Sequence, residues 1–253
     1  MFGVHRAELI YSVSTGDRRL AILSAQLLVD ECRIVQDVEL ACKGLRNAAE
    51  AFATYGEYAE AQAALHESRS LAVTLRYDLH VAKADLRLAD LSIHGMDSAS
   101  AFAYIDAARS TIDASGLQSP LLIADLSLFS CWASVVAGDL PAAAKAARQM
   151  SRCFRGPQQG NANYSLLAVK LATFRGKRSR EIQRDFNVLR SSISTHVHYP
   201  LEQYSLAALL LADHEARLDD EIRTFVGDQF PRLMASGCSI WPFLHDILAA
   251  PHM

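Results

Sequence analysis

The sequence predicts an all-α fold in which antiparallel pairs of helices stack one after another. Apolar residues recur at helical spacing along the 253-residue chain, and runs with the alternation of a half-buried strand are missing. Turn-forming glycines also return at a nearly constant interval: the spacings are 40, 39, 43 and 38 residues between Gly16, Gly56, Gly95, Gly138 and Gly176. A fixed period of this size is typical of a stacked repeat, in which each unit contacts mainly its neighbours.

Local signals place the helices within this period. Asp17 and Ser98 are good N-caps, and Pro120 and Pro141 stand at helix starts, where a missing N–H costs nothing. The turn glycines allow the positive φ that ends a helix cheaply. In chain order, the expected helices cover residues 4–13, 17–35, 37–55, 58–75, 79–94, 98–114, 120–137, 141–154, 162–175, 179–193 and 200–217, followed by one that begins at 219–221 and a last one from Pro242.

About six antiparallel helix pairs and a C-terminal capping helix account for nearly the whole chain. The clear loop at 155–161 contains glycines and a proline, but the repeat pattern resumes at Tyr164. We therefore interpret residues 1–253 as one domain. Each pair has apolar residues on more than one face, and only stacking against neighbouring pairs buries them in a continuous core.

The second helix pair resembles the tetratricopeptide repeat family at its large, small, aromatic and turn positions, which are Leu45, Ala49, Phe52, Gly56, Tyr58, Ala61, Leu65 and Ser68. The resemblance implies a right-handed superhelix, or α-solenoid, with helices longer than in the usual 34-residue repeat. Extended repeats of this kind look like those in sensor domains of bacterial transcriptional regulators and in scaffold subunits of large assemblies. It therefore implies a module that binds a peptide or protein, as a sensor or a scaffold.

The resemblance also implies that the first helix of every pair lines a concave binding groove. The outward positions of these helices are Arg6, Lys43, Arg46, Glu50, Asp85, Trp132, Asn163, Lys170 and Phe174. Cations and an amide at such positions suit the carboxylates and peptide groups of an extended ligand. Trp132 and Phe174 could receive an apolar side chain. The alternative is that Trp132 belongs to the core and that the charges are solvated.

Basic residues concentrate in one segment of the chain. Residues 139–190 contain 11 basic and 3 acidic side chains, a net charge of +8, whereas the flanking segments carry −6 and −5. The cations are Lys145, Arg148, Arg152, Arg155, Lys170, Arg175, Lys177, Arg178, Arg180 and Arg184, among others. Such a cluster attracts anionic partners, so a nucleic-acid-binding module that uses residues 145–184 is the alternative function. Because interleaved aromatics are missing, an acidic protein surface or a second copy of the chain is the preferred partner.

Signatures of catalysis or of a cofactor site are missing from the sequence. There is no Gly-rich phosphate loop, H-E-x-x-H or G-x-S-x-G motif, so we expect no enzyme activity and no cofactor. His196 and His198 are too few ligands for a metal site. Asp90 and His94 lie one helical turn apart and could form an acid–base pair, but we prefer a surface hydrogen bond near a helix end.

Composition predicts a soluble, cytoplasmic chain without a membrane partner. No window approaches the ~18–20 uninterrupted apolar residues of a transmembrane helix. The five cysteines have irregular spacings and no C-x-x-C, which favours buried thiols in a reducing compartment. A second copy of the chain, or an effector domain in a longer protein from which this chain is taken, remains open as a further partner.

Overall fold

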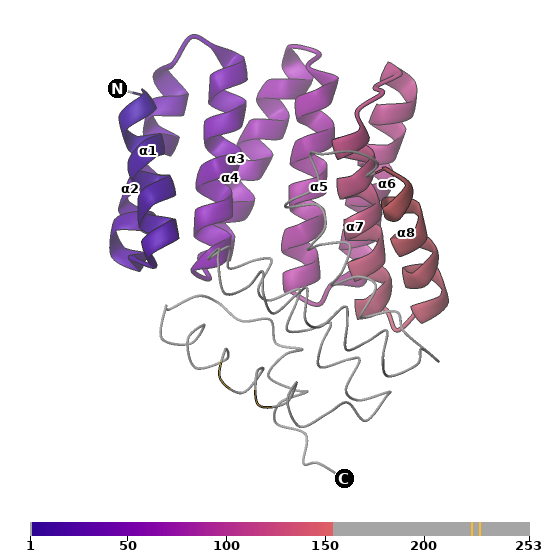
Figure 1. The fold of residues 1–253 in the computed structure, drawn as a ribbon. Helices are drawn as coiled ribbons and strands as arrows, with labels where there is room; N and C mark the ends of the chain where they lie inside the picture. Colours follow the sequence, from indigo (N-terminus) through magenta and orange to yellow (C-terminus); the bar gives the residue numbers. More distant parts are fainter. Residues whose placement is uncertain (1, 154–223, 225–227, 229–253) are drawn as a thin grey trace. The chain divides into compact units, whose positions relative to one another are not determined.

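The computed structural model describes residues 2–153, 224 and 228, and residues 2–153 form eight helices and no strand (Figure 1). This confirms the predicted all-α class. The helices expected after residue 153, including the C-terminal cap, lie outside the described residues. The bounds are α1 Phe2–Thr15, α2 Arg18–Ile34, α3 Val38–Thr54, α4 Tyr58–Thr74, α5 Asp78–His94, α6 Ser98–Ser115, α7 Pro120–Val136 and α8 Leu140–Cys153.

Helix length and spacing follow the predicted repeat closely. The helices α2, α3, α4 and α5 each contain 17 residues. Successive helices from α2 to α6 begin 20 residues apart, so a helix pair recurs every 40 residues. The helix α1 is longer than expected by two residues at each end. None of the helices in the described part is long and apolar enough to cross a membrane.

Six of the seven turns that connect these helices contain one residue with a positive φ. Four are glycines as expected for such turns: Gly16, Gly56, Gly116 and Gly138, with φ from 66° to 84°. The prediction for Gly95 is wrong, because its φ is −77° and the next residue, Met96, takes φ 59°. In each of these turns the following N–H donates to a carbonyl five residues back, as from Glu57 to Phe52 at 2.9 Å. This bond is the hallmark of a Schellman helix end.

Aspartates cap four helix N-termini. The carboxylates of Asp17, Asp37, Asp97 and Asp139 each accept a hydrogen bond at 3.0 Å from the backbone N–H three residues later. The cap of α6 is therefore Asp97, and Ser98, the predicted cap, is the first helical residue. Pro120 opens α7 as expected.

The described residues fall into two compact units, α1–α6 and α7–α8, which we describe separately. Within the first unit, each helix packs against the next along the chain. The first helices of successive pairs also contact one another, α1 with α3 and α3 with α5. The second helices α2 and α4 have no comparable contact. Consequently one side of this unit is closely packed, and the other leaves a space between α2 and α4.

The core contains six of the eight positions on which the family resemblance rests; Gly56 and Tyr58 are partly buried. Leu45, Ala49, Phe52, Ala61, Leu65 and Ser68 are all buried. Small side chains let α3 and α4 approach closely, and Ser68 Oγ donates to the Cys42 carbonyl across their contact at 3.1 Å. In the second unit, Trp132 and Met150 are buried. Burial raises the pKa of the Cys32 and Cys131 thiols to about 12, so they remain protonated as buried apolar groups.

Candidate functional site

Two stripes of polar residues face each other on α3 and α5. On each helix, four polar residues follow one another at intervals of three or four positions, which places them on one side of the helix. Because α3 contacts α5, these stripes meet. We call the combined surface the α3–α5 face; its residues are Glu39, Lys43, Arg46 and Glu50 on α3 and His80, Lys83, Arg87 and Asp90 on α5.

Arg46 is the most unusual residue of this face. Its guanidinium is partly buried, and Nη1 donates to Nδ1 of His80 at 2.9 Å. Burial, with a smaller contribution from the nearby Arg87 charge, lowers the pKa of Arg46 to about 10. Among the described residues, no carboxylate lies within ion-pair distance of this guanidinium. Arg46 is therefore a partly desolvated cation that is still charged at neutral pH and has no direct counter-charge among the described residues.

His80 contributes an acceptor to Arg46 instead of a charge. The residue is only 4 % exposed, and burial together with the Arg46 charge lowers the pKa of its imidazole. Since a guanidinium can only donate, Nδ1 must be the acceptor nitrogen, and the proton of the neutral ring lies on Nε2. This arrangement supports the Arg46 side chain without neutralising it.

Two other cations of the face, Lys43 and Arg87, form ion pairs with carboxylates, of which Glu39 and Glu50 are exposed and Asp90 is partly buried. Lys43 contacts Glu39 at 2.6 Å, and both side chains are about half exposed. Arg87 lies 3.8 Å from Glu50 and 3.7 Å from Asp90. Exposed pairs of this kind contribute only about 0.2–1 kcal/mol each. They can therefore exchange their partners for a ligand's carboxylate at little cost.

The structure places the predicted groove residues in several different environments. Lys43, Arg46 and Glu50 lie together on the α3–α5 face, and Arg6 is exposed on α1. Trp132 is fully buried in the second unit, so it belongs to the core, the alternative given for it above. The predictions for Asn163, Lys170 and Phe174 lie outside the described residues.

The expected outward position of Asp85 is wrong. Its side chain is fully buried and forms an ion pair with Nε of Arg69 on α4. Asp85 precedes Arg87 by two residues, and two helical residues differ by about 200° around the axis, so these side chains face opposite sides. His80 and Arg87 were not among the residues predicted from the sequence. Their signal was the recurrence of polar residues at helical spacing from 80 to 90.

Asp90 and His94 approach each other, but not at the surface. Their side chains lie 3.6 Å apart, and His94 is only 7 % exposed, with its pKa lowered by burial. The preferred interpretation as a surface hydrogen bond is therefore wrong. Among the residues described here, no three potential metal ligands gather in one place. His196 and His198 lie outside the described residues.

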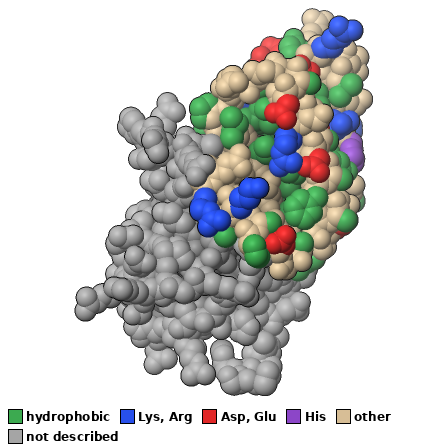
Figure 2. All heavy atoms as spheres, turned by 90° about the vertical axis from the view of Figure 1, so that its right-hand side faces the viewer, with side chains coloured by type: hydrophobic (Ala, Val, Ile, Leu, Met, Phe, Trp, Pro, Cys, Tyr) green, Lys and Arg blue, Asp and Glu red, His purple; other side chains and the backbone are tan. Residues whose placement is uncertain are grey.

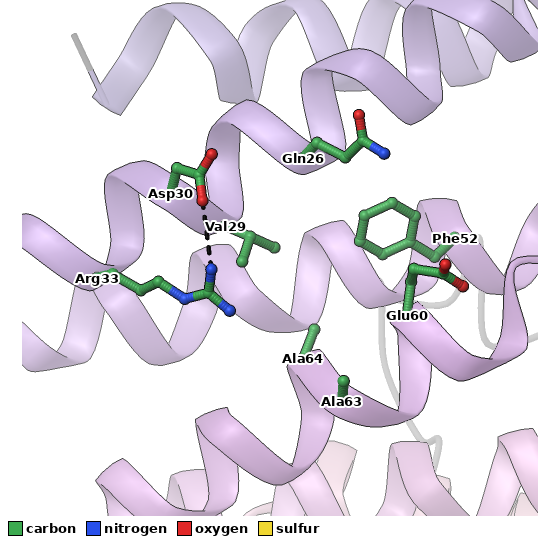
Figure 3. Close-up of a pocket in the computed structure, with 8 residues that line it drawn as sticks. All are labelled: Gln26, Val29, Asp30, Arg33, Phe52, Glu60, Ala63 and Ala64. Carbon is green, nitrogen blue, oxygen red and sulfur yellow. Dashed lines mark hydrogen bonds and ion pairs between the residues drawn. The ribbon is translucent and has the colours of Figure 1, made fainter.

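A groove of about 370 Å³ lies on the other side of the first unit, between α2 and α4 (Figure 3). Its floor includes Val29, Phe52 and Ala64, and its rim carries Gln26, Asp30, Arg33 and Glu60. Ion pairs cross from α2 to α4 on both sides of it, Arg18 with Glu57 at 2.9 Å and Arg33 with Glu67 at 3.0 Å. This groove was not predicted from the sequence, because the family resemblance implies a binding surface on the first helices of the pairs.

Only the beginning of the basic segment is described. Lys145 and Arg148 are exposed one turn apart on α8, and Arg152 lies one turn further along the same helix. On the face shown in Figure 2, basic side chains are interspersed with acidic and apolar ones. The remaining residues of this predicted patch, Arg155, Lys170, Arg175, Lys177, Arg178, Arg180 and Arg184, lie outside the described residues.

Comparison of the chain with protein-family models, with curated proteins and with solved structures finds no match.

Proposed function

We propose that this chain is a binding module that recognises an acidic, extended segment of a peptide or protein through the α3–α5 face. The observation that carries the proposal is the partly desolvated Arg46 guanidinium, which has no carboxylate partner among the described residues. The proposal gives this face a binding role and no catalytic step. The repeat architecture favours use of the module in a sensor or scaffold.

An unpaired, partly buried cation is costly to maintain, because desolvation disfavours the charged form. A carboxylate from a ligand would supply the missing counter-charge. Hydrogen bonds between a guanidinium and a carboxylate are frequently bidentate, and hydrogen bonds to charged groups contribute about 1.5–3 kcal/mol. Lys43 and Arg87 flank this position and could turn from Glu39 and Glu50, their exposed partners, to further acids of the ligand.

The stacking of helices also suits an extended ligand. Packed helices lie roughly 8–10 Å apart, and an extended chain rises about 3.3 Å per residue. Equivalent positions on successive first helices would therefore meet about every third residue of such a ligand. A repeated acid at this interval is the sequence feature that we expect in the partner.

Selection from a displayed library of random peptides tests this proposal. We expect enrichment of peptides with Asp or Glu at three-residue spacing, and at least tenfold weaker binding when the acids of a selected peptide become Asn or Gln. Arg46→Met should produce a similar loss. Arg109→Met is the matched control, because Arg109 is an exposed arginine paired with Asp106 on α6. Equal binding by the Arg46 variant, or no preference for acids, would reject the proposal.

The exposed cations on α8 favour nucleic acid as a second candidate partner. Lys145 and Arg148 begin the segment with net charge +8. Binding of a single-stranded oligonucleotide should then weaken steeply as salt rises, because each neutralised phosphate releases counterions. Lys145→Ala combined with Arg148→Ala should reduce that slope, whereas Arg46→Met should leave it unchanged.

A further inference from the structure

The exposed apolar side chains of the described residues are concentrated on the first two helices. Of the eleven large hydrophobic side chains that are exposed, six belong to α1 and α2. They are Val4, Ile10, Tyr11, Leu23, Leu27 and Ile34, with exposures between 37 % and 83 %. Single exposed apolar residues need no explanation, but a concentration on adjacent helices marks an interaction surface.

These side chains form stripes on the sides of α1 and α2 that face away from the core. On α1, Val4 and Tyr11 lie on the side of the helix opposite the buried Leu9. On α2, Leu23, Leu27 and Ile34 lie opposite a buried stripe that includes Ala21, Ala25, Leu28 and Cys32. Both helices are thus apolar on two faces, although only one face of each is covered. Figure 1 shows α1 and α2 at one end of the first unit. We call the exposed stripes together the outer face of the α1–α2 pair.

We propose that this outer face is the interface through which two copies of the chain associate. The α3–α4 pair supplies the model for the contact, since it packs against a helix pair on either side, through α2 and through α5. A second copy offers a helix pair with the same apolar stripes. An isologous contact of this kind closes after two copies and leaves no apolar stripe in water.

The size and charges of the outer face suit this occupant. Six side chains, each about half exposed, present on the order of 500 Å² of apolar surface, and a standard interface takes about 800 Å² per partner with its polar rim. The rim carries two cations, Arg6 and Arg19, and two acids, Glu8 and Asp30, all exposed. Because both signs occur equally, an identical surface brings an opposite charge for each group.

Sedimentation equilibrium of the full chain over a wide concentration range tests the proposal. We expect a monomer–dimer equilibrium, and we expect Leu23→Glu combined with Leu27→Glu to raise the dimer dissociation constant at least tenfold. Both leucines are exposed, so the circular dichroism spectrum should stay unchanged. Val73→Glu is the matched control, because Val73 is a 50 % exposed apolar residue on α4 and its substitution should leave association intact.

Hydrogen–deuterium exchange of the unsubstituted chain locates the contact without any variant. Amides of α1 and α2 should become more protected as the concentration rises, while those around Val73 should not change. A chain that stays monomeric throughout overturns the proposal and leaves the outer face to a different protein. Dimers that resist the double substitution, or protection confined to other helices, overturn it as well.

Discussion

Arg46 and Asp85 are charged residues of the same unit that have different kinds of partner. Asp85 is fully buried, and its carboxylate is held by Arg69 from the next helix. Burial nevertheless raises its pKa, and its Oδ2 has no hydrogen-bond partner among the described residues. Arg46 has a neutral imidazole as its partner, and no acid pairs with it in the part of the chain that the structure describes. The first charge has a structural partner, whereas we propose that the second takes its counter-charge from a ligand.

Substitutions of the two arginines should therefore affect stability unequally. Arg69→Met removes the partner of a buried carboxylate and should lower the free energy of unfolding by about 2–3 kcal/mol, less than for a fully buried pair because Arg69 is 39 % exposed. Arg46→Met removes an uncompensated charge and one hydrogen bond, so the change should stay within about 1 kcal/mol. Urea titrations of both variants measure this difference. Equal losses would show that Arg46 is a structural residue.

The pKa of His80 leads to a prediction about pH. Since burial and Arg46 lower this pKa, the unfolded chain takes up a proton more readily than the folded chain. Its contribution to stability is complete above the ordinary histidine value of about 6.5 and is lost as the pH falls below it. The free energy of unfolding of the wild type should fall between about pH 7.5 and 5.5.

The variant His80→Gln should show a shallower fall in that pH range. His66→Gln replaces an exposed imidazole on α4 and serves as the control. If both variants lose stability with pH as steeply as the wild type, His80 is not responsible for the slope.

At the scale of elements, the turns between helices repeat one backbone conformation with different residues. Glycine takes the positive φ at Gly16, Gly56, Gly116 and Gly138, whereas Arg76 and Met96 take it as L-residues with a Cβ. This conformation costs L-residues roughly 1–2 kcal/mol. The Schellman hydrogen bonds stabilise these turns and offset the backbone strain, so the helices still end at the turns that contain Arg76 and Met96.

Exchanging residue types at these turns should change stability in opposite directions. A Cβ at Gly116 would meet nothing within 4 Å, so Gly116→Ala tests the backbone alone and should destabilise the chain by about 1 kcal/mol. Met96→Gly should stabilise it by up to about 1 kcal/mol. Thermal unfolding followed by circular dichroism measures both. A melting temperature that moves in the same direction for both variants would contradict this account of the turns.

At the scale of the whole molecule, the described helices contact mainly their chain neighbours within each unit, so damage to one helix should stay local. Leu45 is fully buried where α3 packs on its neighbours, and Leu45→Ala should cost about 2–5 kcal/mol. In native-state hydrogen exchange, the amides of α2, α3 and α4 should open more often, while those of α7 and α8 keep their rates. Uniform acceleration along the chain would indicate one cooperative body instead.

Much of the helix order could be predicted from the sequence because the responsible interactions are local. The carboxylate of Asp17 reaches an N–H three residues away, and the turn at Gly56 uses a bond that spans five residues. Where the prediction was wrong, it was wrong by one residue. The N-cap is Asp97 and not Ser98, and the positive φ is at Met96 and not at Gly95. Interactions of this range leave a mark within a few residues of the chain.

Which side of each helix is exposed could not be predicted from the sequence, because it depends on contacts with helices that are distant along the chain. The helix α5 is flanked by α3, α4 and α6, and only a narrow polar stripe stays accessible, so Asp85 is buried and Arg87 is not. The groove between α2 and α4 follows from the spacing of whole helices. The lack of a carboxylate partner for Arg46 among the described residues has the same origin. Glu50, one turn further along α3, is a natural partner by sequence spacing. In the folded chain Glu50 instead lies near Arg87 of α5, because packing of the two helices brings that guanidinium within 3.8 Å of its carboxylate.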